Sequence, residues 1–588
     1  MDTFQDILNT QLRDALVAAG FASTGAQVTP ATDPRFGDYQ TNAGMVLAKQ
    51  RSQDPRSIAG QIIENFGPSE TIERPSVAGP GFINFTLRPA AVAQKTVEIL
   101  MDERLGVPRT ESRKRIVVDF GSPNVAKPMH IGHIRSIVLG DALARIASFL
   151  GHDVIRDNHI GDWGTQFGMV IYGWRNLLDR QSLARDPIAE LVRVYKETNE
   201  RAAHDLAVRE ACRRELVKLQ SGDAENLSIW KQCVELSMQD FSRTYELLDI
   251  HYDLQHGESF YNDRLPGTVD QLVKSGIAEV SEGAVVVFFR DIPELADKPC
   301  IIRKRDGGFN YATTDLATVD YRVNDLKAEA VWYIVGAPQI LHFKQIFEIA
   351  RREGYSADFR HIVFGSILGE DRKLMKTRSG ENVPLRDVLE EAIARARKIS
   401  EEKNPGLSEA DKMDIAQKVG IGAVKYVDLS QYRMTDYVFS WDKMLSLQGN
   451  TAPYLQNAYV RIRSIFRKAD VAEPLGRGGP RQAGVSHRQS AVAPTQQLVL
   501  NDTAEIHLAK RLCQFAEIVP QVLNDFRPNI LANYLFDLAN TFHSFYEACP
   551  VLKAEEPSRS SRLALCDLTG RILQRGLELL GIKVPERM

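Results

Sequence analysis

Two histidines three residues apart, His130 and His133, could act on a phosphorylated substrate. They follow the apolar run KRIVVDF (114–120) and a turn-rich segment, and the residues from 129 to 151 carry the apolar spacing of a helix. We predict a strand, a turn and a helix, with both histidines on one face of the first helical turn. Free N–H groups at a helix N-terminus attract anions, and two imidazole donors there would stabilise a transferring phosphoryl group. Between them, Gly132 leaves bare backbone against which a flat ring could pack.

Taken alone, an HxxH pair is more often two surface residues or a weak metal site. Zinc is disfavoured, because no cysteine and no third ligand lies near the pair in the sequence. The six cysteines are scattered without a CxxC pair, which indicates reduced structural thiols rather than a zinc ribbon or a disulfide framework.

The strand and helix order around the histidines predicts how they are held. The segment 152–164 has the pattern of a strand followed by a loop, and another helix begins near residue 165. This βαβ order predicts an α/β, Rossmann-like domain with a parallel sheet. Residues 171–280 are highly charged and helical, which indicates an insertion between two halves of that sheet. We expect the strands to resume at 283–289, 300–304, 330–335 and 361–368.

Three units are predicted along the chain. Residues 1–110 have the pattern of a small α+β domain, residues 111–382 form the Rossmann-like domain with its helical insertion, and residues 383–588 are almost entirely helical. One stretch within the last unit, 471–497, is rich in Gly, Pro, Ser and Gln and is predicted to be a long surface loop.

Composition narrows the class of protein. The chain has 588 residues, of which 44% are hydrophobic and 25% charged, as in an ordinary globular protein of several domains. No apolar run approaches the roughly 18 residues that span a bilayer, and the N-terminus is acidic and amphipathic rather than a secretion signal. We therefore expect a cytoplasmic enzyme without a membrane partner. The net charge of −3 means that any RNA contact must come from local basic faces.

The wider strings around the histidines carry a family resemblance. SPNVAKPMHIGHIRS (122–136), followed by DNHIGDWGTQFG (157–168), resembles the HIGH signature region of class I aminoacyl-tRNA synthetases, and the wording is most similar to the arginyl-tRNA synthetases of bacteria. The resemblance covers nearly the whole chain. Supporting strings are FGDYQTN (36–42), YATTDLA (311–317), VGIGAVKYVDLS (419–430), GNTAPYLQNAYVRIRS (449–464) and the last three residues, Glu586, Arg587 and Met588.

This resemblance implies an arginine–tRNA ligase. Such an enzyme forms arginyl-adenylate from L-arginine and ATP, releases pyrophosphate, and transfers arginine to the 3′ end of tRNA(Arg). It also implies Mg²⁺ that arrives with the substrate, no zinc, a monomer, and a C-terminal anticodon-binding domain. By the same resemblance, the ATP-binding residues would be Gly132, His130, His133 and His342.

The arginine-binding residues implied by the resemblance are Asp119, Ser122, Asn124, Tyr311, Asp315 and Gln339. A guanidinium group needs planar carboxylate acceptors, which suits the two aspartates. Asp315 has a plainer alternative as a charge at a helix N-terminus, with Thr313 or Thr314 as the cap. Tyr311 has the alternative of packing in the core.

The second class I signature, the mobile KMSKS loop, is degenerate in this chain. In GEDRKLMKTRSGENV (369–383), Thr377 stands where the second lysine belongs, and the register of 373–380 is open. Lys376 and Arg378 are nearby cations that could meet the ATP phosphates. Lys127, just before the HIGH string, could supply the missing catalytic charge from the other side. Its alternative is a solvent-exposed loop lysine.

RNA contacts are predicted in two places. The helix 457–469 carries cations and interleaved aromatics, a combination typical of single-stranded RNA binding, and we select Tyr459 and Arg463 from it. Such a charge run can equally be a solvated helix face. The N-terminal unit resembles a domain that meets the tRNA elbow, and its candidates are Phe36, Tyr39, Gln40 and Asn42. Both aromatic residues of that set could instead belong to the core of a small domain.

Two rival functions remain open at this point. A class I ligase for another amino acid would not place carboxylates at Asp119 and Asp315. A non-catalytic RNA-binding paralogue would explain the degenerate second signature, but it would not need the intact HIGH and YATTD strings.

Overall fold

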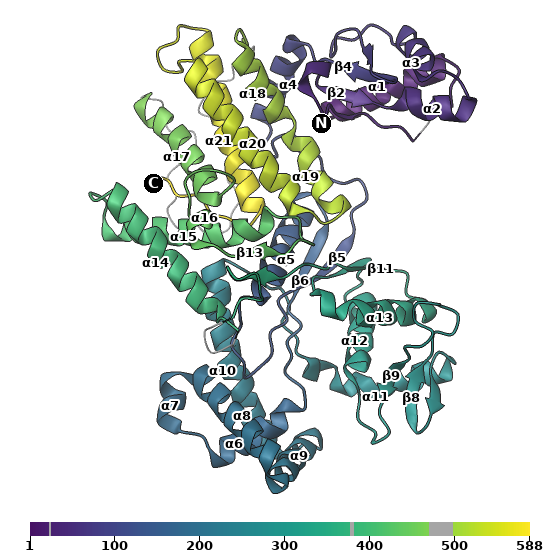
Figure 1. The fold of residues 1–588 in the computed structure, drawn as a ribbon, viewed down its shortest axis with the longest axis vertical. Coiled ribbons are helices and arrows are strands. Elements are labelled where there is room, and N and C mark those ends of the chain that lie inside the picture. Colours follow the sequence, from purple (N-terminus) through teal and green to yellow (C-terminus); the bar gives the residue numbers. More distant parts are fainter. Residues whose placement is uncertain (23–24, 377–381, 470–497) are drawn as a thin grey trace.

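The computed structural model describes residues 1–22, 25–376, 382–469 and 498–588, and its centre is a four-stranded parallel sheet (Figure 1). The strand order is β11-β10-β5-β6, and all neighbours are parallel. This confirms the predicted Rossmann-like domain. The strands are β5 (Arg115–Asp119), β6 (Asp153–Asp157), β10 (Ala330–Tyr333) and β11 (Asp358–His361).

Helix α5 (His133–Phe149) follows β5 and is buried along nearly its whole length. It lies very close to the chain at the end of β5, because a Cβ atom on Gly140 would lie only 2.3 Å from the Phe120 ring. The bare backbone at Gly140 therefore permits the tight helix–sheet packing that fixes where the helix begins.

The strands expected after the insertion do not all join the parallel sheet. β7 (Glu279–Ser281), β8 (Ala284–Val287) and β9 (Cys300–Arg303) form a separate antiparallel sheet. The connection between β7 and β8 is too short for a parallel crossover and forces a hairpin. The expected strand at 361–368 is also divided: β11 ends at its start, and β12 (Ile367–Leu368) pairs with β13 (Tyr437–Val438).

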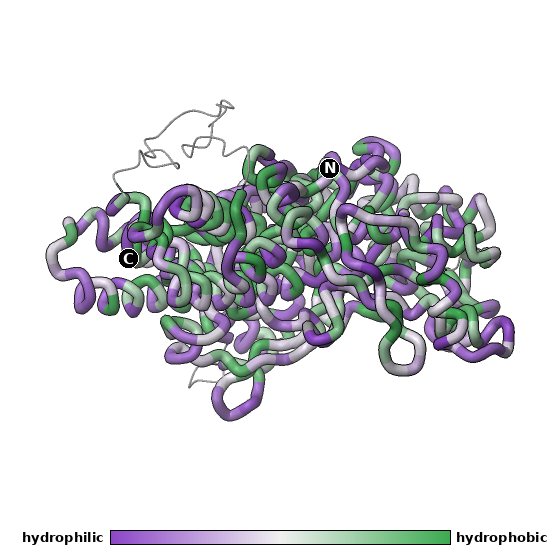
Figure 2. Tube along the Cα trace, turned by 90° about the horizontal axis from the view of Figure 1, so that it is seen from above, coloured by the Kyte–Doolittle hydropathy of each residue, from purple (hydrophilic) through white to green (hydrophobic). Residues whose placement is uncertain are grey.

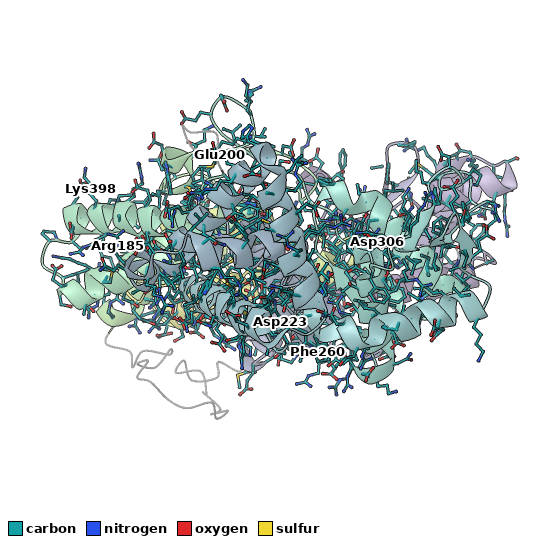
Figure 3. The ribbon with its side chains drawn as sticks, turned by 90° about the horizontal axis from the view of Figure 1, so that it is seen from below. Arg185, Glu200, Asp223, Phe260, Asp306 and Lys398 are labelled. Atoms are coloured by element: carbon teal, nitrogen blue, oxygen red, sulfur yellow. The ribbon has the colours of Figure 1, made fainter. Side chains whose placement is uncertain are left out.

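The charged region after β6 is helical, as predicted, and extends away from the sheet (Figure 1). It presents charged side chains to solvent, among them the exposed Arg185, Glu200 and Asp223 (Figure 3). The helices are α6 (Gln166–Asn176), α7 (Arg180–Arg185), α8 (Pro187–His204), α9 (Leu206–Gln220) and α10 (Ala224–Leu248). Beyond them, α11 (Leu265–Lys274), α12 (Tyr311–Asp320) and α13 (Ile340–Arg352) pack with the small antiparallel sheet.

The N-terminal residues form a separate antiparallel sheet of order β1-β2-β4-β3, covered by helices. A partly buried ion pair of 2.8 Å, between Asp38 and Lys510, joins this unit to the C-terminal helices. Its elements are α1 (Phe4–Ala18), β1 (Thr29–Pro30), β2 (Tyr39–Thr41), α2 (Ala43–Arg51), α3 (Pro55–Glu64), β3 (Ser76–Ala78) and β4 (Phe82–Phe85), and α4 (Pro89–Met101) leads to the central sheet.

The C-terminal part is a helical assembly against one side of the sheet domain (Figure 1). Polar and apolar residues alternate along its outer helices (Figure 2), as in amphipathic helices on a shared core. In the described residues, no helix is both long and apolar enough to cross a bilayer. The helices are α14 (Leu385–Lys403), α15 (Glu409–Leu429), α16 (Trp441–Met444), α17 (Ala452–Lys468), α18 (Thr503–Cys513), α19 (Phe515–Asn524), α20 (Pro528–Ala548) and α21 (Ser558–Leu579). The predicted loop at 471–497 lies outside the described residues.

Candidate active site and RNA-binding surfaces

The two histidines lie side by side at the amino end of α5, with ring centres 4.0 Å apart. The helix begins at His133 with Gly132 as its N-cap, so His130 precedes the helix instead of lying on its first turn as predicted. The backbone N–H of His130 donates to Nδ1 of His133 over 3.1 Å, and the N–H of Gly132 donates to Nδ1 of His130 over 3.1 Å. Because each Nδ1 accepts, each ring carries its proton on Nε2.

Burial keeps both rings uncharged near neutral pH. It lowers the pKa of His133 to about 4 and lowers the pKa of His130 as well. The pair can therefore donate two hydrogen bonds to a phosphate without bringing a proton to it. A Cβ atom on Gly132 would lie 3.0 Å from the His130 ring, so the lack of a side chain at this position makes room for the ring.

The segment after the second signature pairs directly with the histidine segment. The N–H of Ile131 donates to the carbonyl of Val383 over 2.9 Å, and the N–H of Leu385 donates to the carbonyl of Met129 over 2.9 Å. An antiparallel bridge joins the exposed Lys376 to Asn382, which brings the second signature to the same site. The other predicted cation of that loop, Arg378, lies outside the described residues.

A second cluster gathers at the amino end of α12. Nε2 of His342 lies 2.5 Å from a carboxylate oxygen of Asp315, and the Tyr311 ring is 4.8 Å from the His342 ring. The Tyr311 side chain is exposed, so it is not a core residue here. Asn310 provides the helix cap, and Thr313 instead donates to a strand carbonyl. The structure thus places His342, which was predicted to bind ATP, against a predicted arginine-binding carboxylate.

Asp119 has a different environment from Asp315. Its carboxylate is buried at the end of β5 and accepts from the guanidinium of Arg322 over 2.8 Å. The same guanidinium contacts Asp157, at the end of β6, over 2.7 Å. The other carboxylate oxygen of Asp119 accepts from the Ser122 hydroxyl over 3.2 Å. An internal guanidinium therefore occupies the position expected for the substrate's guanidinium, and the carboxylate faces Ser122 instead.

The sequence interpretation missed Arg322, because nothing in the local sequence marks it. It lies on a π-helical turn, Tyr321–Asp325, that continues α12. π-turns are rare and often occur at functional sites. Its two carboxylate partners are far away in the chain, and only the parallel register of β5 and β6 brings them together.

The loop between β5 and α5 holds the remaining predicted amino-acid ligands. Ser122 and Ala126 both have a left-handed backbone, with φ of 47° and 60°. The backbone N–H of Ser122 donates to the Asn158 side chain over 3.1 Å. Asn124, which lies between Ser122 and Ala126 in the sequence, is exposed. The last predicted ligand, Gln339, is exposed on the short turn Ala337–Gln339 that leads into the helix of His342.

Glu258, which is close enough to Asp315 to be influenced by its charge, is a further residue that the sequence interpretation missed. Burial, together with the negative charges of Asp315 and Asp162, raises the pKa of Glu258 to about 8. A carboxyl group held protonated by burial and by neighbouring carboxylates is suited to receive a cation, because a bound positive charge would oppose the shift in pKa. The sequence around it, HGESFYNDR (256–264), gave no recognised signal.

The N-terminal RNA candidates divide into interior and surface residues. Tyr39 is buried, and its hydroxyl donates to the Glu517 carboxylate over 2.9 Å, so it is not presented to RNA. Phe36 is exposed. Gln40 and Asn42 line a cavity of about 480 Å³, whose other lining residues are Gly25, Ala26, Gln27, Thr29, Val46 and Phe82. This cavity could receive a base that leaves the RNA stack.

The C-terminal candidates were selected from the wrong face of their helix. Tyr459 and Arg463 are buried in α17, where the helix packs on α21. The same helix presents Arg461, Arg467 and Lys468 to a cavity of about 490 Å³. Tyr546 and Arg587 also line this cavity, so cations and an aromatic ring are combined there.

In the part of the chain that the structure describes, no three His, Cys, Asp or Glu side chains form a group that could hold a metal ion.

Comparison with known proteins gives a consistent set of matches. Residues 95–441 match the family model "tRNA synthetases class I (R), catalytic domain", residues 3–87 match "Arginyl tRNA synthetase N terminal domain", and residues 455–588 match "DALR anticodon binding domain". The arginine–tRNA ligase of Synechococcus elongatus is 44% identical over 597 residues, covering 98% of this chain and 99% of the relative. That of Cellvibrio japonicus is 44% identical, covering 99% and 100%.

Solved structures agree over the full length. The arginyl-tRNA synthetase of Plasmodium falciparum is 28% identical with a TM-score of 0.83, and that of Thermus thermophilus is 27% identical with a TM-score of 0.82. Both alignments cover 100% of this chain and 100% of the solved chain.

Proposed function

The chain belongs to the arginyl-tRNA synthetases of class I, and from that premise we propose which of its side chains carry out each step. It is an arginine–tRNA ligase that uses ATP. The observation that carries the assignment of the active site is the backbone pairing of 129–131 with 383–385, because it unites the two signature segments. The arginine-reading cluster at α12 belongs to the same domain.

The first step is proposed to depend on charge stabilisation at the ATP phosphates. An arginine carboxylate oxygen attacks the α-phosphorus of ATP, the bond from phosphorus to the bridging oxygen breaks, and pyrophosphate leaves with its electrons. The Nε2 protons of His130 and His133 donate to the phosphates, and the ammonium group of Lys127 neutralises the growing charge. Lys376 and Arg378 assist from the second signature. Mg²⁺ accompanies ATP by binding its phosphate oxygens.

Arginine specificity is assigned to the α12 cluster. Asp315, oriented by His342, receives the guanidinium, with Tyr311 and Gln339 beside it. The raised pKa of Glu258 supports a second carboxyl group at the same place. Asp119, Ser122 and Asn124 are proposed to hold the amino and carboxylate groups of the amino acid, which the contact between Asp119 and Ser122 supports.

The tRNA is proposed to contact both ends of the chain. The cavity of Gln40 and Asn42, with Phe36 nearby in sequence, would meet the elbow, and the cavity of Arg461 and Tyr546 would meet the anticodon loop. We retain three functional units, 1–110, 111–382 and 383–588. We also propose that the enzyme acts as a monomer, because one chain provides every group of the site, and in the cytoplasm, where its tRNA is used.

The experiment that tests this function is ATP–pyrophosphate exchange with arginine, with and without tRNA(Arg). We expect exchange only when tRNA is added, as in arginyl enzymes generally. Absence of exchange under both conditions would favour the non-catalytic paralogue, and exchange without tRNA would contradict the tRNA dependence alone.

The elbow contact makes a separate prediction. Asn42→Ala should raise the KM for tRNA in aminoacylation by about tenfold, the effect of one or two lost hydrogen bonds, and leave the KM for arginine unchanged. Asn65→Ala is the matched control, since Asn65 is exposed just after α3 in the same unit and does not line the cavity. Equal effects of the two substitutions would remove the cavity from the tRNA interface.

A further inference from the structure

Lys127 lies between the sheet and the helical insertion, and its side chain is exposed. Its ammonium nitrogen is 5.5 Å from the centre of the Tyr195 ring, on helix α8 of the insertion. Among the described residues, no carboxylate pairs with this ammonium group. The lysine is therefore held near a ring while its charge stays uncompensated.

The backbone beside Lys127 is held by the same insertion. Ala126 has a left-handed backbone with φ of 60°, which is unfavourable for alanine. Its N–H donates over 3.0 Å to the hydroxyl of Ser237, a fully buried residue of α10. One turn later on α10, Asp240 pairs with Arg386, which follows the segment paired to the histidines. Helix α10 thus contacts both the loop before α5 and the first turn of α14, which follows the segment paired to the histidines.

We propose that Tyr195 is a positioning residue for Lys127, and that the insertion thereby directs this ammonium group to the ATP phosphates. The inference rests on the catalytic role proposed for Lys127. A lysine on an exposed loop has a long flexible stem and would occupy many directions. The face of an aromatic ring attracts an ammonium group and limits these directions.

An aromatic ring is suited to this task for an electrostatic reason. A carboxylate partner would hold the lysine more strongly, but it would cancel the positive charge that the phosphates need. The ring quadrupole holds the cation without a neutralising charge, so Lys127 can exchange the ring for a phosphate oxygen at little electrostatic penalty. Because the second signature lacks one lysine, Lys127 must keep its full positive charge for the phosphates. An aromatic partner leaves it that charge, and no acidic partner is present among the described residues.

Four variants test the inference: Tyr195→Leu, Tyr195→Phe, Lys127→Ala and the double variant Tyr195→Leu/Lys127→Ala. The half-buried Tyr195 also packs on the core, and leucine keeps that apolar contact while it removes the ring face. Tyr195→Leu should lower the kcat of tRNA-dependent ATP–pyrophosphate exchange about three- to tenfold. The KM for arginine should stay unchanged. Tyr195→Phe, which keeps the ring, should stay within about twofold of the parent enzyme.

The double variant separates positioning from a merely structural role. In the Lys127→Ala background, Tyr195→Leu should have no further effect on kcat, because the residue that it positions is gone. A further slowing of the same size, or equal slowing by leucine and phenylalanine, would overturn the inference. If Lys127→Ala is slow and Tyr195→Leu is normal, the positioning role falls and the role of Lys127 stands. If Lys127→Ala itself is normal, the proposed catalytic role fails. Tyr195→Met is the second ring-free variant if the leucine protein does not fold.

Discussion

Replacing Lys127 by alanine is expected to slow arginine activation by about a hundredfold or more, the size of effect seen when one charge-stabilising group is removed from a reacting centre. The second signature lacks a lysine at Thr377, so little other positive charge is available for the transferring phosphate. The KM for arginine should change little, because Lys127 does not belong to the α12 cluster that is proposed to bind the amino acid. The measurement is tRNA-dependent ATP–pyrophosphate exchange, with kcat and the KM for arginine determined separately.

The matched controls for this prediction are Lys127→Arg and Lys376→Ala. The arginine side chain of Lys127→Arg keeps the positive charge in nearly the same place, so this variant should recover part of the activation rate. Lys376 is exposed on the described edge of the second signature, and its loss should have a smaller effect if Lys127 supplies the main charge. A larger loss of rate from Lys376→Ala would return the catalytic role to the second signature.

The sequence predicted the site best where local pattern and tertiary structure agree. A buried apolar strand before His130 and a helix after it follow from short-range spacing, and both are present. The start of that helix was placed four residues early, because the pairing of Met129 and Ile131 with a segment near residue 384 holds the chain extended there. Such a pairing depends on residues more than 250 positions away, which a local pattern does not contain.

The surroundings of several predicted site residues differ from those expected for one physical reason: the type of a residue does not determine which partner it contacts. Tyr459 and Arg463 have the right chemistry for RNA, but packing of α17 on α21 turns them inward. Arg461 and Lys468 lie on the opposite, open face of the same helix. Similarly, the chemistry of Asp119 suits a guanidinium, and the guanidinium that it binds is that of Arg322. In both cases only the tertiary structure decides which face or which partner is used.

Asp315→Asn is expected to lower kcat/KM for arginine by about a thousandfold, because removing one charge from a hydrogen-bonded charge pair that the substrate shields from water is worth several kcal/mol. The amide keeps the shape and the contact with His342 but loses the negative charge that the guanidinium needs. Asp306→Asn is the matched control on the exposed loop before α12 (Figure 3). It should leave kcat/KM within about twofold, the range of surface substitutions. Similar losses in the two variants would exclude Asp315 as the specificity residue.

The pH dependence of arginine binding gives this prediction a second readout. In the free enzyme the pKa of Glu258 is raised to about 8, by burial first and then by the charges of Asp315 and Asp162, so the group holds a proton at neutral pH. A bound guanidinium favours the ionised form, so binding releases that proton, and arginine affinity should rise with pH and level off above about 8. Asp315→Asn removes one of the charges that raise the pKa. The plateau of the variant should therefore begin at lower pH, although its affinity is weaker throughout. The KM for arginine measured from pH 6 to 9 checks this, and a plateau that does not move would separate Glu258 from the arginine site.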